Sequence, residues 1–243
     1  MGDRPRARQF IKNVDGFITL SRSVLDDISE FDKLKPKVFS PHPVYDHYGE
    51  IIPKEKAIQE LGLDPSTNYI LFFGFIRDYK GLDLLLEALA DERLKNFNLK
   101  LMIAGEYYSG EEKYKALIKE LHLEDRVISK NEFISDSKVA AHFCASDVVV
   151  QPYRTATQSG VTQIAYYFNK PMIVTNVGGL AELVPDAKAG YVVEPSAHAI
   201  ADALVRFYSE KKENDFSLAA AEEKKKFEWR SFSGKLVELF RKL

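Results

Sequence analysis

Uninterrupted apolar runs recur along this chain and alternate with stretches whose apolar residues fall at helical spacing. An apolar run without alternation is typical of a parallel strand covered on both faces, whereas spacings of three and four residues indicate a helix with one buried face. Because the two patterns alternate almost throughout, the sequence predicts an α/β fold: a doubly wound, Rossmann-like parallel sheet with helices on both faces. The expected strands are Phe17–Leu20, Lys37–Phe39, Tyr69–Gly74, Leu99–Ala104, Arg126–Ser129, Asp147–Gln151, Met172–Thr175 and Tyr191–Val193. The expected helices are Ser21–Glu30, Lys54–Leu61, Leu82–Ala90, Glu111–Leu121, Asp136–Cys144, Val161–Phe168 and Ala197–Tyr208, with a last helical stretch in Phe216–Leu243.

The segment Ser40–Pro53 interrupts this alternation. It holds three prolines, one glycine and several polar aromatic residues without a clear period, which is typical of a linker or hinge. Only one strand–helix–strand unit precedes it, too little for a stable core, whereas six expected strands follow it. We therefore expect residues 1–45 to be the remnant of a missing N-terminal domain, residues 46–215 a complete domain, and residues 216–243 a helical extension. The alternative is that residues 1–45 extend a single sheet.

Composition and charge narrow the class of protein. The 243 residues carry a formal charge of −2, which gives no electrostatic footprint for nucleic acid. The single cysteine, Cys144, excludes an internal disulfide, and its apolar surroundings predict a buried core thiol. No apolar stretch reaches the length of a membrane-spanning helix. Arg4, Arg6 and Arg8 form a small basic start, which leaves open both a solvated end and attraction to anionic lipid.

The stretch Ile70–Ala90 predicts a strand, a polar turn and an amphipathic helix. Arg77 and Lys80 lie in that turn, between Gly74 and Gly81. They are thereby held at the carboxyl end of a parallel strand and beside a helix start, where open α/β sheets bind ligands and anions are favoured. Two cations in this place indicate a phosphate or diphosphate site, with an ordinary solvated basic loop as the alternative.

A second loop region is expected at the same edge of the sheet. After Pro152 a loop of small and polar residues leads to a helix start near Ser159–Gly160, and the next strand runs into Gly178–Gly179. Small residues at a helix start let backbone amides approach an anion closely. Together with Arg77 and Lys80, these loops predict a converging polar rim.

Other chemistries find little support in the sequence. Ser159 lacks the flanking glycines of a nucleophile elbow, and the chain has neither a G-x-G-x-x-G nor a Walker loop. His42, Asp46 and His47 could be imagined as metal ligands, but their place in the proline-rich linker favours ordinary linker polarity.

With these segments the chain resembles the retaining glycosyltransferases of family 4 (glycosyltransferase group 1), which have the two-domain GT-B fold. The motifs that carry the resemblance are G-F-I-R-D-Y-K-G-L-D-L-L-L-E-A from Gly74, L-M-I-A-G-E from Leu101, F-I-S-D from Phe133, A-S-D-V-V-V-Q-P from Ala145, K-P-M-I-V-T-N-V-G-G-L-A-E from Lys170, G-Y-V-V-E-P from Gly190 and F-E-W-R-S-F from Phe227. The resemblance covers nearly all of the chain but only the C-terminal half of a typical enzyme. Residues 10–45 are similar to the last unit of the family's N-terminal domain.

The resemblance implies a role for each candidate residue. Arg77 and Lys80 would neutralise the two phosphates of a nucleoside diphosphate sugar and stabilise the departing diphosphate, which makes them the catalytic candidates. Base and ribose, distal phosphate and sugar would be held by Gly74, Glu106, Asn131, Phe133, Ile134, Thr157, Gln158, Ser159, Gly160, Val161, Gly178 and Gly179, partly through backbone groups. In the family the C-terminal segment crosses back, so we expect Phe216–Leu243 to dock near residues 10–45.

The chain also departs from the family. Many members carry two glutamates, eight positions apart, in the loop and helix that follow Pro152. Those positions fall here near Ala156–Thr157 and Ile164–Ala165, and neither holds a carboxylate. Gln158 or Gln163 could bond to hydroxyl groups instead, although a neutral amide cannot stabilise a developing oxocarbenium charge as a carboxylate does. Arg154 is a further candidate for a phosphate contact, with a surface arginine as the alternative.

The function implied is retaining hexosyl transfer from a nucleoside diphosphate sugar to a hydroxyl acceptor, without a cofactor or metal. The acceptor, a glycan or lipid-linked saccharide, would be held through the missing domain, so we expect this chain to bind the donor without transferring sugar. The expected location is cytoplasmic, with peripheral association of the parent enzyme at the inner face of a membrane left open. Two alternatives remain: a non-catalytic donor-binding module that acts with a partner subunit, and a sugar-nucleotide epimerase, which would need carboxylates in the cleft.

Overall fold

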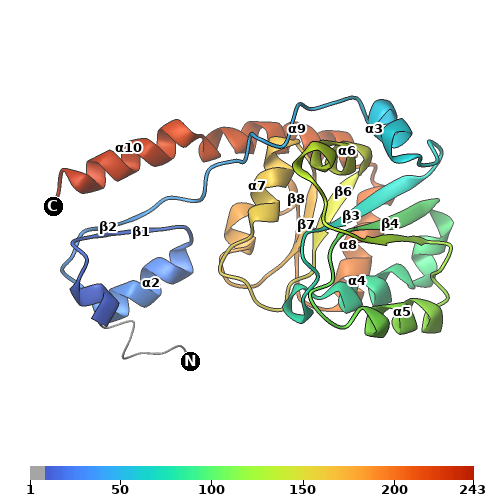
Figure 1. Ribbon diagram of the computed structural model, residues 1–243, viewed down its shortest axis with the longest axis horizontal. Coiled ribbons are helices and arrows are strands. Elements are labelled where there is room, and N and C mark those ends of the chain that lie inside the picture. The colour runs from blue at the N-terminus through green and yellow to red at the C-terminus, as the bar shows by residue number, and fades with distance from the viewer. Residues whose placement is uncertain (1–8) are drawn as a thin grey trace.

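The computed structural model of the protein describes residues 9–243, so Arg4, Arg6 and Arg8 lie outside the described part. Its main body is a six-stranded, all-parallel sheet with helices on both faces (Figure 1). The strands are β3 (Asn68–Phe73), β4 (Leu99–Gly105), β5 (Val127–Asn131), β6 (Val148–Gln151), β7 (Met172–Thr175) and β8 (Gly190–Val193). The predicted fold class is confirmed, and the expected strands appear with boundaries shifted by at most two residues.

Two hydrophobic cores sandwich this sheet. In β3, Tyr69 and Leu71 point into one core, whereas Ile70 and Phe72 point into the other, which explains why the strand sequence is apolar throughout. Their contacts place α3 (Lys54–Leu61), α6 (Asp136–Ala145), α7 (Gly160–Tyr167) and α9 (Glu213–Glu223) on the first face, and α4 (Leu82–Leu89), α5 (Glu111–Glu120) and α8 (Ala197–Ser209) on the second.

The strand order is β5-β4-β3-β6-β7-β8. The chain proceeds outward from β3 in one direction, returns to the other side of β3 at β6, and continues outward from there. In such sheets the connections after the two central strands leave toward opposite faces, and a crevice opens outside their carboxyl ends. The order therefore places the ligand-binding edge between the turn after β3 and the loop after β6.

Residues before the linker form a separate lobe. Its strands β1 (Phe17–Thr19) and β2 (Lys37–Phe39) pair in parallel with each other, and α2 (Arg22–Phe31) connects them. This two-stranded sheet is separate from the six-stranded one, so the described residues 9–45 do not extend that sheet. Residues 40–53 contain no helix or strand.

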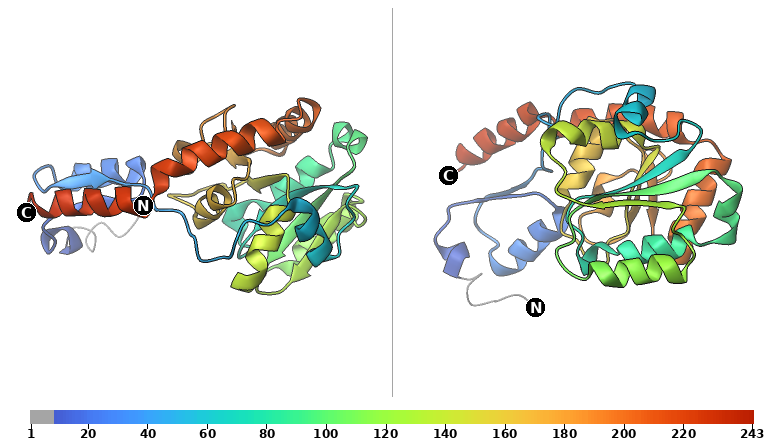
Figure 2. Two further views of the ribbon diagram at one scale, coloured as in Figure 1. Left: turned by 90° about the horizontal axis from the view of Figure 1, so that it is seen from above. Right: turned by 45° about the vertical axis from the view of Figure 1, so that its right-hand side comes forward.

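The C-terminal segment is broken into pieces rather than forming one helix. After α9 come a 3₁₀ turn, η4 (Lys224–Phe227), and α10 (Trp229–Phe240), which runs beside β2 in both figures (Figures 1 and 2). Lys235 Nζ donates to the carbonyl oxygen of Phe39 at 3.2 Å. The segment thus returns to the N-terminal lobe. No helix in residues 9–243 combines the length and apolarity needed to cross a membrane.

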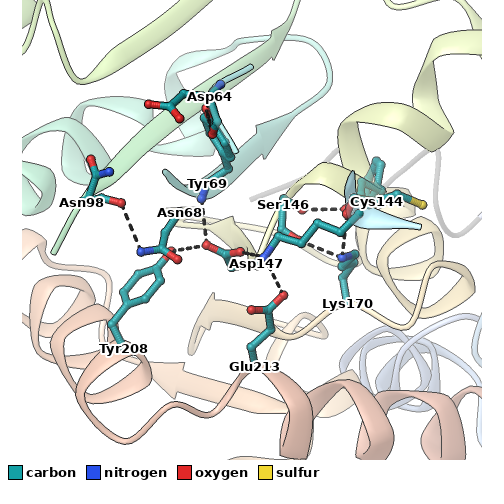
Figure 3. A network of polar contacts seen from close by, with 12 residues as sticks. Asp64, Asn68, Tyr69, Asn98, Cys144, Ser146, Asp147, Lys170, Tyr208 and Glu213 are labelled. Atoms are coloured by element: carbon teal, nitrogen blue, oxygen red, sulfur yellow. Dashed lines mark hydrogen bonds and ion pairs between the residues drawn. The ribbon is translucent and has the colours of Figure 1, made fainter. Parts of the chain in front are cut away.

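At the amino ends of β3 and β6 lies a polar network (Figure 3). Asp147, which is 1% exposed, forms an ion pair with Lys54 of α3 and accepts hydrogen bonds from Tyr69 N at 2.8 Å and the Tyr208 hydroxyl at 3.3 Å. Lys54 Nζ also contacts Glu213 Oε1 at 2.9 Å. Burial raises the pKa of Asp147, and the attraction of Lys54 opposes that shift. The network ties β3 and β6 to α3, α8 and α9.

Candidate functional site

Lys80 is the central side chain at the carboxyl edge of the sheet. It lies in a 3₁₀ turn, η1 (Asp78–Lys80), between β3 and α4, and only 8% of it is exposed. A Cβ atom placed on Gly74 would lie 3.2 Å from Lys80 Nζ and 3.8 Å from Val161 Cγ2, so the ammonium lies beside the start of α7. The side chain has no hydrogen bond or ion pair to any of the described residues. Burial, reinforced by the charge of Arg77, lowers the pKa of Lys80 to about 8.

The burial of Lys80 differs from the ordinary solvated loop that the sequence left as the alternative. A close approach between η1 and the end of β6 causes the burial. Gly81 has φ +66°, and a Cβ there would lie 2.0 Å from the carbonyl oxygen of Pro152, so only glycine fits without a shift of the backbone. The sequence showed the glycine but not the neighbour that makes it necessary.

Arg77 is exposed, as expected for a side chain on the rim. Its guanidinium carbon lies 4.4 Å from the centre of the Tyr108 ring, a cation–π contact that leaves the N–H donors available. Within residues 9–243 it has no ion pair. Arg154, the further candidate for a phosphate, is engaged instead: its two terminal nitrogens bind both oxygens of Asp83 at 2.8 Å. This bidentate pair makes Arg154 a link between the loop and α4, which favours the alternative of a surface arginine over a phosphate contact.

The start of α7 offers backbone donors. Ser159 is the N-cap: its hydroxyl oxygen accepts from Val161 N at 3.2 Å and contacts the Tyr153 hydroxyl at 3.2 Å. The Val161 amide, expected to meet a phosphate, is therefore already paired. The N–H groups of Thr157, Gln158 and Gly160 have no acceptor among the described residues, and together with the dipole of α7 they favour an anion beside Lys80.

A pocket of about 200 Å³ opens next to this anion site, at the ends of β3, β4 and β5. Four expected donor-binding residues line it together: Gly74, Glu106, Phe133 and Ile134. Tyr48 of the linker also lines it, which the sequence reasoning missed because the linker was treated as a hinge alone. The polar aromatic residues of that linker were the available signal.

Asn131 does not line this pocket. Its side-chain oxygen accepts from Tyr107 N at 3.1 Å, and its amide nitrogen donates to Glu111 Oε2 at 2.5 Å. These bonds fasten the loop between β4 and α5 to the end of β5. The side chain of Asn131 thus supports the loop beside the site, and a contact of this residue with base or ribose, through its backbone, stays a prediction.

The double glycine packs against the loop after β6. Gly178 has φ +48°, and a Cβ there would lie 1.9 Å from the carbonyl oxygen of Ala156. A Cβ on Gly179 would lie 2.2 Å from the carbonyl oxygen of Thr157 and 2.5 Å from Ser21 Cβ. The pair therefore supports the loop from behind and marks the contact between the two lobes.

A cavity of about 370 Å³ lies between the lobes, lined by Thr157 and Gln158 on one side and by apolar residues of the N-terminal lobe on the other. Nearby, the carboxylate of Glu182 accepts from the backbone N–H of Arg22 at 3.0 Å and of Ser23 at 3.4 Å. It thereby caps α2 from the opposite lobe.

The residues at and near the positions of the absent glutamates differ in how far they are buried. Ile164 and Ala165 are buried in the core, whereas Gln163, 1% exposed, has neither side-chain amide atom hydrogen-bonded among the described residues. Gln158 is exposed. Of the two glutamines considered, Gln163 is the buried one.

The linker histidines do not form a metal site: within residues 9–243, no three His, Cys, Asp or Glu side chains are grouped so that they could hold a metal ion. His42 Nδ1 lies 2.7 Å from the carbonyl oxygen of Pro43. Cys144 is buried in the core as expected, and burial raises the pKa of its thiol.

Comparisons with known proteins agree with this architecture. The sequence profile of the family described as "Glycosyl transferases group 1" matches residues 53–224. D-inositol 3-phosphate glycosyltransferase from Corynebacterium urealyticum is 28% identical over 97% of this chain, which spans 58% of that relative's length.

Two solved structures share the fold. Sucrose-phosphate synthase from Thermosynechococcus elongatus superposes with a TM-score of 0.82 at 21% identity, covering 99% of this chain and 62% of that protein. Anabaena HepE in complex with UDP and glucose gives a TM-score of 0.80 at 20% identity, covering 99% of this chain and 66% of that protein. Because the family profile matches well over half of the sequence, the chain belongs to the glycosyl transferases of group 1.

Proposed function

We propose that this chain is the donor-binding part of a retaining glycosyltransferase, which transfers a hexosyl unit from a nucleoside diphosphate sugar to a hydroxyl acceptor. The observation that carries the proposal is the buried ammonium of Lys80, which lies at the switch point of the sheet. Within residues 9–243 it has no hydrogen bond or ion pair, only a cation–π contact with the Tyr153 ring, whose centre lies 5.6 Å from Nζ. A buried cation without an anionic partner destabilises the fold unless a ligand compensates its charge. A diphosphate is the ligand that both this cation and the unpaired amides of α7 favour.

The reaction would use these groups as the glycosidic bond breaks. Negative charge grows on the departing diphosphate, and Lys80 and Arg77 would stabilise it more in the transition state than in the bound donor. Because Lys80 is screened from water, its attraction for that charge is stronger than at the surface. The leaving phosphate would itself take the proton of the attacking hydroxyl. In this scheme the two cations supply the charge neutralisation, so it needs neither a metal nor a cofactor.

The nucleoside would occupy the pocket lined by Gly74, Glu106, Phe133 and Ile134, beside the diphosphate site. The UDP and glucose held by Anabaena HepE support a donor of this class. D-inositol 3-phosphate glycosyltransferases among the relatives support a hydroxyl acceptor. We place the acceptor, a glycan or lipid-linked saccharide, mainly against parts of the parent enzyme beyond this donor domain.

The proposal is tested by titrating the chain with UDP, GDP and ADP, each with and without an attached hexose, in a calorimeter. A parallel assay for released diphosphate, with a range of acceptors, follows transfer. We expect the chain to bind the nucleoside diphosphates of one base and to transfer no sugar, because alignment of the acceptor requires a second domain. Failure to bind any diphosphate would overturn the proposal, and robust transfer by this chain would overturn the placement of the acceptor.

A further inference from the structure

The linker between the lobes lies along α7 rather than hanging free. Val44 N donates to the carbonyl oxygen of Phe227 at 2.9 Å, and the Tyr167 hydroxyl donates to the carbonyl oxygen of Gly49 at 3.0 Å. Residues 44–49 are therefore fastened at both ends, and the aromatic side chains between these bonds have fixed places.

Tyr45 packs on the first turn of α7. A Cβ placed on Gly160 would lie 3.4 Å from Tyr45 Cε2 and 3.6 Å from its hydroxyl oxygen. The neighbouring residue, Val161, lies beside Gly74, which Lys80 Nζ also approaches. Tyr45 and Lys80 thus border the same helix start, where the amide of Gly160 has no acceptor among residues 9–243.

His42 holds Tyr45 in this place. Its ring lies 4.7 Å from the Tyr45 ring, and Nε2 lies 3.4 Å from the Tyr45 hydroxyl. Because the carbonyl of Pro43 can only accept, Nδ1 of His42 carries the proton of that 2.7 Å bond. In the neutral ring Nε2 is then an acceptor, so the Tyr45 hydroxyl donates to it and keeps its lone pairs for another donor.

Gln163 lies beneath this part of the linker. Residues 160, 163 and 167 share one face of α7, and both Gly160 and Tyr167 contact the linker. Gln163 is 1% exposed, and neither polar atom of its carboxamide is paired among the described residues, so it keeps hydrogen-bonding capacity for a ligand atom or a bridging water.

Tyr48 occupies the other end of the same segment. It lines the pocket of about 200 Å³ together with Gly74 and Glu106, and its ring centre lies 6.2 Å from that of Tyr45. One short stretch of linker therefore borders both the nucleoside pocket and the anion site.

We propose that this linker completes the donor site, with Tyr48 closing the nucleoside pocket and Tyr45, positioned by His42, contacting hydroxyl groups of the transferred sugar beside Gln163. The inference rests on the proposed function and extends it. A phenol and a carboxamide each donate and accept, which suits sugar hydroxyls, and both lie at α7, the helix that lacks the family's second glutamate. Sugar selection thus depends on neutral groups, one of them from outside the donor domain.

The test compares affinities of the full chain for UDP and UDP-glucose, and for GDP and GDP-mannose, by calorimetry. For the nucleotide whose base binds, we expect Tyr45→Phe to weaken the affinity for the nucleotide sugar by about 5- to 10-fold, while the affinity for the diphosphate changes less than about 2-fold. The ratio of the nucleotide-sugar affinity to the diphosphate affinity therefore falls. His42→Ala should lower this ratio too, and His42→Gln, which keeps an acceptor, should restore part of it. Tyr48→Ala should weaken diphosphate and conjugate equally.

Asp46→Asn is the matched control, because Asp46 is exposed between the two tyrosines, and it should change neither affinity. Thermal unfolding of each variant shows that it is folded, and Tyr45→Phe keeps the ring that packs on Gly160. An unchanged ratio in Tyr45→Phe would overturn this inference alone. Failure of the wild-type chain to bind UDP, GDP or ADP would overturn the proposed function beneath it.

Discussion

The two ends of the six-stranded sheet differ in how buried charge is compensated. At the amino end, Asp147 is paired with Lys54 and accepts two further hydrogen bonds. At the carboxyl end, Lys80 is 8% exposed, yet within residues 9–243 it has no ion pair or hydrogen bond and only a cation–π contact with the Tyr153 ring. The first arrangement stabilises the fold, whereas the second costs stability and is understandable only if a ligand supplies the missing charge.

Removal of the carboxylate at the amino end should produce the largest loss of stability. We expect Asp147→Ala to lower the free energy of unfolding by about 3 kcal/mol, since it leaves Tyr69 N unpaired and Lys54 without its buried partner. Urea denaturation followed by circular dichroism measures the change. Glu213→Gln is the matched control, because the Glu213 side chain is 38% exposed, and it should cost less than about 1 kcal/mol. A loss no larger than that of the control would contradict the comparison.

The corresponding change at the carboxyl end should have the opposite sign. We expect Lys80→Met to raise the free energy of unfolding of the ligand-free chain by about 1 kcal/mol, because it removes an uncompensated buried charge and keeps an apolar stem of similar length. The same denaturation experiment applies. Destabilisation by Lys80→Met would show that the protein itself, through contacts such as that with the Tyr153 ring, compensates the charge of the ammonium.

The stabilisation by Lys80→Met should depend on pH in a defined direction. The pKa of Lys80 is lowered to about 8 from its usual 10.5, so between these values the unfolded chain binds more protons than the folded one. The cost of the buried charge is therefore constant below pH 8 and is relieved as the pH rises toward 10.5. The stability difference between wild type and Lys80→Met should shrink over that range; a difference that stays constant would argue against a depressed pKa.

The contact between the lobes should give the smallest effect. Glu182→Gln removes the charge that caps α2 and should lower the free energy of unfolding by about 0.5 kcal/mol. Hydrogen exchange offers a more local measurement, with faster exchange expected at the amides of Arg22 and Ser23. Unchanged exchange at both amides would show that the cap contributes nothing in solution. Glu124→Gln, at an exposed position, serves as the control.

Local pattern was sufficient to predict the sheet and much of the site. Apolar runs fix the strands, and glycine at Gly74 and Gly81 marks the turn that carries Arg77 and Lys80. The burial of Lys80 could not be predicted, because it depends on the carbonyl of Pro152, 71 residues beyond Gly81, lying 2.0 Å from where a Cβ would be.

The side-chain contacts that the sequence did not reveal have the same kind of cause. Asn131 lies at a strand end, as the pattern indicated, but Glu111 and Tyr107 engage its side chain. Arg154 is on the correct loop, but Asp83 binds it. Tyr45 and Tyr48 were read as linker polarity, since only the fold brings residues 44–49 alongside α7. Pairing across long separations in the sequence decides each case.

The most direct measurement is the affinity of the chain for UDP, GDP and ADP at pH 7, compared between wild type, Lys80→Met and Arg77→Ala. For the diphosphate that binds, Lys80→Met should lower the affinity by about 10- to 100-fold, as expected for the loss of a charge-assisted contact. Arg77→Ala should lower it by less, because the Arg77 side chain is exposed. Asp147→Asn, at the opposite end of the sheet, should leave the affinity unchanged wherever the variant is folded. Equal affinity in wild type and Lys80→Met would contradict the central claim that the buried ammonium awaits a phosphate.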